Sequence, residues 1–137
     1  MPFASKHLDL KPSRWLYVVF VVVENPRETL ARCAALWFEQ QPAQIVAVTG
    51  TNGKTSVASF CQQIWSNLDI EAVSIGTNGV RGAWTQPLRH TTPDALEMHQ
   101  LLFNLKANGI DHVALEASSH GLDQSRLDGV QFSGACF

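Results

Sequence analysis

The stretch VAVTGTNGKTS, from Val46 to Ser56, joins a short apolar run, a turn with two glycines and a Lys-Thr pair. A short apolar run bounded by a turn predicts a buried strand, and the residues after the lysine have the apolar spacing of a helix. Glycines allow the N–H groups of a turn to approach an anion closely, and the following helix directs its free N–H groups toward the same point. The stretch therefore predicts a phosphate-binding loop between a strand and a helix.

The glycine spacing in this loop differs from the common phosphate-binding pattern GxxxxGK[ST]. That pattern has a glycine where this chain has Val48, whereas the glycine that is present, Gly50, lies only three residues before Gly53. An ordinary tight turn is the alternative interpretation. Lys54 and Thr55 at the start of the helix favour nucleotide phosphate, since the lysine would contact the outer phosphates and the threonine hydroxyl would coordinate magnesium.

Strands alternate with amphipathic helices along the chain. We expect strands at residues 17–23, 44–48, 71–76, 111–116 and from 129 onward, and helices at 24–41, 54–68 and 92–109. This alternation predicts an α/β fold, with a mostly parallel sheet and helices on both faces. Ligands of such sheets bind beyond the carboxyl ends of the strands, where the loops Thr49–Thr55 and Glu116–His120 are expected, with residues 89–94 as a third candidate.

The apolar spacing of each helix predicts one buried face. We expect Asn25 to cap the first helix, Thr92 to cap the third, and Asn108-Gly109 to end the third. The expected buried residues are Leu30, Cys33, Ala34 and Trp37 in the first helix, Val57, Phe60, Cys61, Ile64 and Leu68 in the second, and Met98, Leu101, Leu102 and Leu105 in the third.

The composition is that of one globular domain. The 137 residues are 45% hydrophobic and 16% charged, and the net charge of −2 gives no electrostatic reason to expect nucleic acid or an anionic membrane as a partner. The apolar run from Trp15 to Val23 is far shorter than the ~20 residues of a membrane span, so we interpret it as a buried strand. The three cysteines form no CxxC pair, and we expect buried, reduced thiols in a cytoplasmic protein.

An acidic residue follows the apolar strand HVALE at the same predicted sheet edge. Glu116 ends this strand directly before a polar loop. A solvated surface carboxylate is the alternative, but a strand that delivers a carboxylate beside a phosphate-binding loop is typical of magnesium ligation. Thr55 and Glu116 are therefore the predicted metal ligands.

Three blocks, TGTNGKTS, HTTPDA and EASSHGLDQSRLDGV, together resemble the central ATPase domain of the Mur ligases, and among these the MurE-type branch. That family has the shortened loop GTNGK[ST], which explains why Val48 replaces a glycine. Folylpolyglutamate synthetases have a similar loop, GTNGKG, but here Thr55 follows the lysine. The resemblance covers the chain from about Val18 to Phe137.

The resemblance implies roles for individual residues. ATP would be bound by Gly50, Thr51, Asn52, Gly53, Lys54, Thr55 and Ser56, with Lys54 catalytic and with Mg²⁺ held by Thr55 and Glu116. The muramoyl dipeptide would be bound by Thr91, Thr92, Ser118, Gln124 and Arg126. His90 stands where relatives often have asparagine. For Arg126 the alternative is a surface ion pair with Asp123 or Asp128.

The activity implied by the resemblance is ATP-dependent amide ligation in peptidoglycan precursor synthesis. The enzyme would phosphorylate a carboxylate of UDP-N-acetylmuramoyl-L-alanyl-D-glutamate, and the amine of diaminopimelate, or of lysine, would attack the acyl phosphate. Both reacting partners are anions, so a lysine, a magnesium ion and loop amides suit the chemistry. The full-length enzyme is expected to be a cytoplasmic monomer.

The resemblance also implies a division of the chain. Residues 1–43 would be a leader with the remnant of a preceding domain and a linker helix, and residues 44–137 would be the N-terminal part of the central domain. The family has three domains, and its second magnesium ligand and its carbamylated lysine are expected outside these residues. We therefore expect no ligation by this polypeptide alone. A P-loop kinase or GTPase, and a non-catalytic remnant that serves as an interaction surface, are the alternatives.

Overall fold

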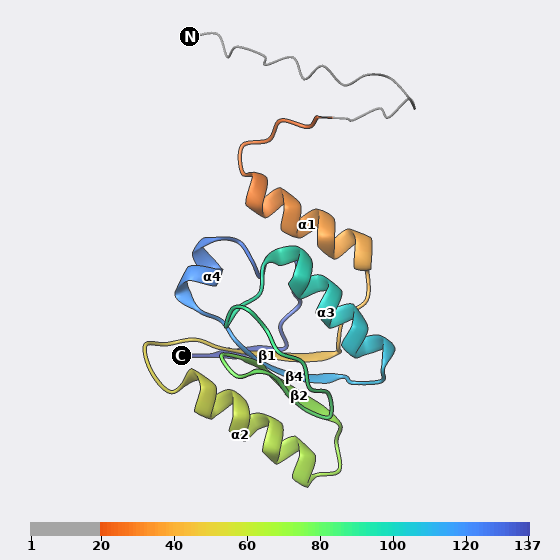
Figure 1. Ribbon diagram of the computed structural model, residues 1–137, viewed down its shortest axis with the longest axis vertical. Helices are drawn as coiled ribbons and strands as arrows, with labels where there is room; N and C mark the ends of the chain where they lie inside the picture. Colours follow the sequence, from red (N-terminus) through yellow and green to blue (C-terminus); the bar gives the residue numbers. More distant parts are fainter. Residues whose placement is uncertain (1–19) are drawn as a thin grey trace.

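Five strands form one sheet in the order β3-β2-β4-β1-β5, and the computed structural model describes residues 20–137 of the chain (Figure 1). The strands are β1 (Gln44–Val48), β2 (Ala72–Gly76), β3 (Gly79–Gly82), β4 (His112–Glu116) and β5 (Gly134–Cys136). The helices are α1 (Pro26–Phe38), α2 (Lys54–Asn67), α3 (Ala95–Ala107) and α4 (Ser119–Asp123). The α/β fold with a mostly parallel sheet is thereby confirmed.

The strand register brings the predicted functional loops to one edge of the sheet. β1 pairs in parallel with β4 so that Val48 lies opposite Glu116, and β2 pairs in parallel with the other side of β4. Among the strands of residues 20–137, only β3 runs antiparallel, against β2. The carboxyl ends of β1, β2 and β4 therefore lie together, which is where ligands of open α/β sheets bind.

Helices cover both faces of the sheet (Figure 1). α2 packs on one face against β2 and β4, and α3 covers the other face, with α1 lying on α3. The predicted buried face of α3 is confirmed, since Met98, Leu101, Leu102 and Leu105 are at most 2% exposed. They form the main core with apolar side chains of the sheet, which include Ile45, Val73, Ile75, Val113 and Leu115.

The helix caps agree with the sequence at two of three positions. Asn25 caps α1 by accepting from the Glu28 N–H, and α3 ends at Asn108 with Gly109 in the left-handed region at φ 81°. The prediction that Thr92 caps α3 is wrong. Asp94 is the N-cap and its side chain accepts from the Glu97 N–H, because Pro93 shifts the helix start two residues beyond the threonine.

The predicted buried face of α1 is largely wrong. Leu30 is 53% exposed, Trp37 is 82% exposed and Cys33 is also exposed, whereas Ala31 and Ala34 are buried. The buried alanines lie on the side of α1 that faces α3. Small side chains let two helices approach closely, and this packing outweighed the preference of the larger side chains for burial.

Four of the five residues predicted to be buried in α2 point outward instead, and only Cys61 of that set lies toward the sheet. Val57, Phe60, Ile64 and Leu68 are between 38% and 64% exposed. The face toward the sheet has Ala58, Cys61 and Trp65, which pack around Val48 and Ala114. Both faces of α2 show apolar residues at helical spacing, so periodicity alone did not distinguish them. The small Ala58 is the residue that lets the helix lie close to the sheet.

The predicted buried strand before α1 and the predicted burial of the cysteines also disagree with the structure. Residues 20–23 form no strand, and Phe20 and Val22 are 88% and 96% exposed, so this part of the predicted buried strand is wrong, while residues 17–19 lie outside the described part of the chain. The cysteines are free thiols, as expected, but Cys33 and Cys136 are exposed and Cys61 is half-buried. None of the helices in the described residues is long and apolar enough to cross a bilayer.

The polar stretch after β2 contains a hairpin that the sequence analysis missed. β2 and β3 are joined by a two-residue turn, Thr77-Asn78, followed by Gly79 at φ 81°. Thr77 and Asn78 do not have positive φ, so the left-handed residue that closes the turn is Gly79, a conformation that glycine adopts freely. A side chain at Gly79 would also lie 2.5 Å from the Gln86 carbonyl, because the segment after β3 folds back across the hairpin.

Candidate functional site

The glycine loop has the backbone geometry that an anion-binding turn needs. Gly50 has φ 124° and Gly53 has φ 81°, values that other residues rarely adopt. Gly53 is the N-cap of α2 and makes no side-chain cap, so the first N–H groups of the helix are free to meet a ligand. The residues between the two glycines, Thr51 and Asn52, are exposed.

Lys54 lies folded over this loop. Its Nζ donates a hydrogen bond of 2.7 Å to the Gly50 carbonyl and a longer one of 3.5 Å to the Thr51 carbonyl. The ammonium group thus sits at the loop itself, close to the N–H groups of the α2 N-terminus. Two sources of positive potential meet at one point, which suits a multiply charged anion.

Glu116 is the buried charged group at the centre of the site. Glu116 is only 2% exposed. Its carboxylate accepts hydrogen bonds from Thr55 Oγ1 at 3.0 Å and from the Thr77 N–H at 3.0 Å. No Lys, Arg or His of the described residues forms an ion pair with it. A buried carboxylate without a cation partner is costly, and its chemistry, with the threonine hydroxyl beside it, fits a divalent cation such as Mg²⁺.

Gly76 and Thr77 belong to this centre, although the sequence analysis did not single them out. A Cβ atom on Gly76 would overlap the Glu116 carboxylate, so glycine is what leaves room for the acid at the end of β4. Thr77 donates its N–H to Oε1, and its hydroxyl lies 3.4 Å from Oε2. The signal that could have found them is a Gly-Thr pair that directly follows a predicted strand at the same sheet edge.

The two predicted substrate threonines occupy different environments. Thr91 is half-buried, and its hydroxyl lies 3.1 Å from the Thr77 hydroxyl, which links it to the Glu116 centre. Thr92 is only 1% exposed, and its hydroxyl donates to the Glu116 carbonyl at 2.9 Å and lies 3.0 Å from Ser118 Oγ. The Thr92 hydroxyl therefore ties the loop after β4 to the start of α3, and Thr91 is the member of the pair that faces the site.

Arg126 and Gln124 form a local unit beside these threonines. The Arg126 guanidinium donates to the Thr92 carbonyl at 2.8 Å and twice to Gln124 Oε1, at 2.6 and 3.0 Å. It pairs with neither Asp123 nor Asp128, so the surface ion pair that was its alternative role is not formed. Three donated bonds hold the guanidinium in a fixed orientation.

A hollow of about 150 Å³ adjoins this unit. Its lining consists of Arg27, Leu30, Asp94, Ala95, Gln124 and Arg126. His120 lies in α4 and is hydrogen-bonded locally, with its Nε2 2.8 Å from Gln124 Nε2. His99 is buried against the Asp128 carbonyl and is structural.

The structure thus brings the predicted residues together at the carboxyl edge of the sheet in two connected groups. Thr55 and Glu116 are in direct contact, and Thr91 joins them through Thr77. Thr92 connects this group to Ser118 and Arg126. Within residues 20–137 no three His, Cys, Asp or Glu side chains cluster as a metal site, and the candidate cation ligands of this group are the Glu116 carboxylate and the Thr55 hydroxyl.

These features define an open α/β domain with a candidate anion and cation site at its carboxyl edge. Residues 48–137 match the family model of the Mur ligase middle domain, and the chain belongs to this family.

Known relatives are similar over most of this chain. A protein of Brucella melitensis named UDP-N-acetylmuramoyl-L-alanyl-D-glutamate–2,6-diaminopimelate ligase is 50% identical over 116 residues, which are 84% of this chain and 24% of the relative. A ligase of the same name from Bradyrhizobium diazoefficiens is 50% identical over 125 residues, 88% of this chain and 25% of the relative. A solved structure of such a ligase superposes with a TM-score of 0.75 at 33% identity, covering 84% of this chain and 24% of that one. The chain spans about a quarter of the length of these relatives.

Proposed function

We propose that this chain is the nucleotide-binding part of an ATP-dependent amide ligase of peptidoglycan precursor synthesis. The reaction would add meso-diaminopimelate to UDP-N-acetylmuramoyl-L-alanyl-D-glutamate. The observation that carries the proposal is the Thr55–Glu116 contact beside a glycine loop that positions Lys54. The names of the similar proteins favour diaminopimelate over lysine.

The chemistry explains why these residue types occur together. A carboxylate is a poor acylating agent because its leaving group would be oxide. Transfer of the γ-phosphoryl group from ATP to the carboxylate gives an acyl phosphate, and the amine of the second substrate displaces phosphate from it. Carboxylate and triphosphate repel each other, so the Lys54 ammonium and the loop N–H groups would stabilise the charge that accumulates between them.

Magnesium is part of this proposal. Thr55 and Glu116 would hold the ion, which, when bound, supplies positive charge to the phosphate oxygens. Thr77 orients the carboxylate from the opposite side through its N–H. Gly50, Thr51, Asn52, Gly53 and Ser56 would complete the ATP site with their backbone groups.

The muramoyl dipeptide would lie across the second group of residues. Thr91, Ser118, Gln124 and Arg126 would contact it, and Thr92 would position the loops that carry them. We further propose a cytoplasmic location, a monomeric full-length enzyme, no nucleic-acid or membrane partner, and the division of the chain at residues 1–43 and 44–137.

Calorimetric titration of the 137-residue chain with ATP and Mg²⁺ tests the nucleotide site. We expect ATP binding that weakens at least tenfold in Lys54→Ala, because an ammonium–phosphate hydrogen bond is lost. Arg32→Ala is the matched control, since it removes an equal charge from an exposed ion pair with Glu28 and should bind ATP unchanged. Preference for GTP would reject the ligase, and equal ATP binding by Lys54→Ala would reject the site.

A further inference from the structure

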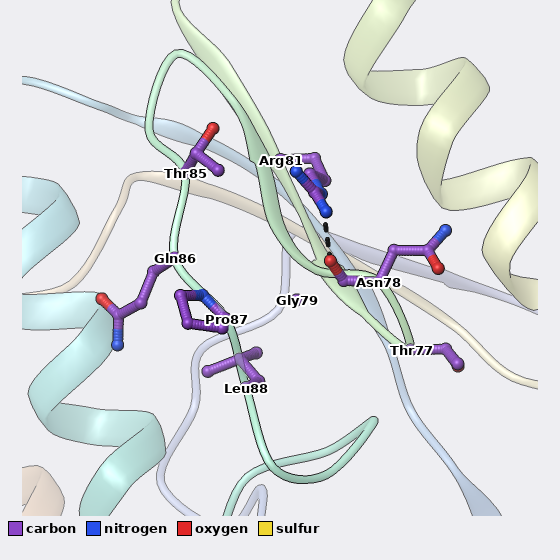
Figure 2. Close-up of a pocket in the computed structure, with 8 residues that line it drawn as sticks. All are labelled: Thr77, Asn78, Gly79, Arg81, Thr85, Gln86, Pro87 and Leu88. Atoms are coloured by element: carbon purple, nitrogen blue, oxygen red, sulfur yellow. Dashed lines mark hydrogen bonds between the residues drawn. The ribbon is translucent and has the colours of Figure 1, made fainter.

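A hollow lined by none of the residues assigned above to ATP or the muramoyl dipeptide lies beside the β2–β3 hairpin (Figure 2). Its volume is about 270 Å³. The hairpin turn forms one wall, and the segment after β3 folds back to form the other. The lining residues are Thr77, Asn78, Gly79, Arg81, Thr85, Gln86, Pro87 and Leu88.

Arg81 is the charged residue of this hollow. Its Nε donates a hydrogen bond of 3.0 Å to the Asn78 carbonyl, so the guanidinium reaches back over the hairpin turn (Figure 2). Its two terminal nitrogens have no hydrogen-bond partner, and the group forms no ion pair, within the described part of the chain. A guanidinium anchored through Nε presents a pair of donors to a carboxylate or phosphate.

The rest of the lining suits an anion of low charge. Its lining residues from the described chain include no Asp or Glu, and the polar groups of Thr77, Thr85 and Gln86 are uncharged. Pro87 and Leu88 add apolar surface. One positive charge beside hydroxyl, amide and aliphatic groups matches a carboxylate on a short aliphatic chain better than a triphosphate, which needs several cations.

The hairpin turn connects this hollow to the Glu116 centre. The Thr77 N–H donates to the Glu116 carboxylate, while the carbonyl of the next residue, Asn78, accepts from Arg81. Arg81 also lines a second, smaller hollow, together with Thr55 and Glu116. Arg81 thus lies next to the place where phosphoryl transfer is proposed to occur.

We propose that the hollow at Arg81 binds a carboxylate of a small aliphatic acid or peptide terminus. Which molecule supplies this carboxylate rests on the proposed function. Its two substrates offer the glutamyl end of the muramoyl dipeptide and the carboxylates of diaminopimelate. The glutamyl end has two carboxylates and only one reacts, so a guanidinium beside the reaction centre would hold the other. Arg81 would then select which carboxylate meets ATP.

Titrations of the full 137-residue chain, followed by amide chemical shifts and calorimetry, test this proposal. The probes are the dipeptide L-Ala-D-Glu, its diamide (which lacks both carboxylates), meso-diaminopimelate and inorganic phosphate. We expect at least one carboxylate probe to bind, with shifts at Thr77 and Gln86, and its affinity to fall about tenfold or more in Arg81→Gln. Whichever probe depends on Arg81 identifies the source.

Controls separate this proposal from simple charge loss and from misfolding. Arg32→Gln should leave carboxylate binding unchanged, and Arg81→Lys should retain part of it, because an ammonium keeps the charge without the paired donors. Equal binding by Arg81→Gln, equal binding of the diamide, preference for phosphate, or binding of no probe would each overturn the proposal. Magnesium-ATP titration of the same variants reports on the proposed function separately, since Arg81→Gln should retain ATP binding and Lys54→Ala should not.

Discussion

The hydroxyl of Thr55 donates a 3.0 Å hydrogen bond to Oε2 of Glu116, a residue 61 positions away in the chain. The contact exists because β1 and β4 are parallel neighbours whose carboxyl ends coincide, so that the residues beyond them meet. The start of α2 and the end of β4 therefore bring the Thr55 hydroxyl and the Glu116 carboxylate into contact. The proposed magnesium ligation needs this arrangement.

Replacing Glu116 by glutamine should abolish the magnesium dependence of ATP binding. The amide retains an oxygen for the Thr77 N–H but has no charge for a cation, so we expect affinity with Mg²⁺ to fall at least tenfold toward the magnesium-free value. Calorimetry with and without Mg²⁺ measures this. Glu71→Gln, on an exposed residue, is the control. An unchanged magnesium effect in Glu116→Gln would place the ion elsewhere.

Gly76→Ala should disturb the same centre from the neighbouring strand. Its new methyl group would overlap the Glu116 carboxylate, and overpacking of this kind costs about 1–3 kcal/mol. We expect a lower midpoint in chemical denaturation together with weaker magnesium-ATP binding. Gly134→Ala in β5 is the matched control, because its Cβ would make only an ordinary contact of 3.9 Å with Val46. Wild-type stability and binding in Gly76→Ala would show that the carboxylate has room to move.

Truncation of two apolar residues distinguishes the core from the outward face of α2. Leu102 is fully buried, and its replacement by alanine should reduce the free energy of unfolding by about 2–5 kcal/mol. Phe60 is 60% exposed, and Phe60→Ala should change it by no more than about 0.5 kcal/mol. Urea denaturation of both variants checks the pair. A large loss in Phe60→Ala would mean that this face is covered in solution.

Asp111 should contribute a pH-dependent increment of stability. The Lys106 ammonium, 2.6 Å from Oδ1, and then the Ala43 N–H lower the pKa of this carboxyl below its ordinary value of 3.8. Because the folded-state pKa is depressed, the stabilisation is present above about pH 4 and is lost as the pH falls through the folded-state value. The side chains of Lys106 and Asp111 are 34% and 39% exposed, so solvent screening limits the effect to about 1 kcal/mol or less.

The variant Asp111→Asn measures that increment. Denaturation at a series of pH values should show the wild type more stable near neutral pH and the two proteins converging in acid. A difference that stays constant down to pH 2 would assign the effect to packing and not to charge, since asparagine can still accept the hydrogen bond from the Ala43 N–H.

Much of the fold and the site was predictable because it is encoded locally. The strand Gln44–Val48, the glycine turn and the start of α2 are each specified by residues within a few positions of one another. The same is true of the buried face of α3, because Met98, Leu101, Leu102 and Leu105 follow one another at helical spacing. Parallel pairing then follows from the alternation of strands and helices, and with it the shared sheet edge.

The orientation of α1 and α2 was not predictable from their own residues. Both α2 faces are apolar, and the choice between Phe60 and Ala58 depends on how closely the sheet lets the helix approach. The close approach of α1 to α3 likewise placed the small Ala31, and not Leu30, against α3. Such choices are made by the shape of the partner surface, which no short stretch of sequence contains.

The sequence alone predicted the glycine turn, the lysine that follows it and the acid Glu116 at the end of a neighbouring strand, because each of these features depends on adjacent residues. Only the folded arrangement decided that Gly76 makes space for Glu116, that the buried Thr92 hydroxyl joins two loops, and that Arg81 and Glu116 hydrogen-bond to the same hairpin turn. Those relationships join residues distant in sequence, and they arise from strand register and close packing, which are set by the whole domain at once.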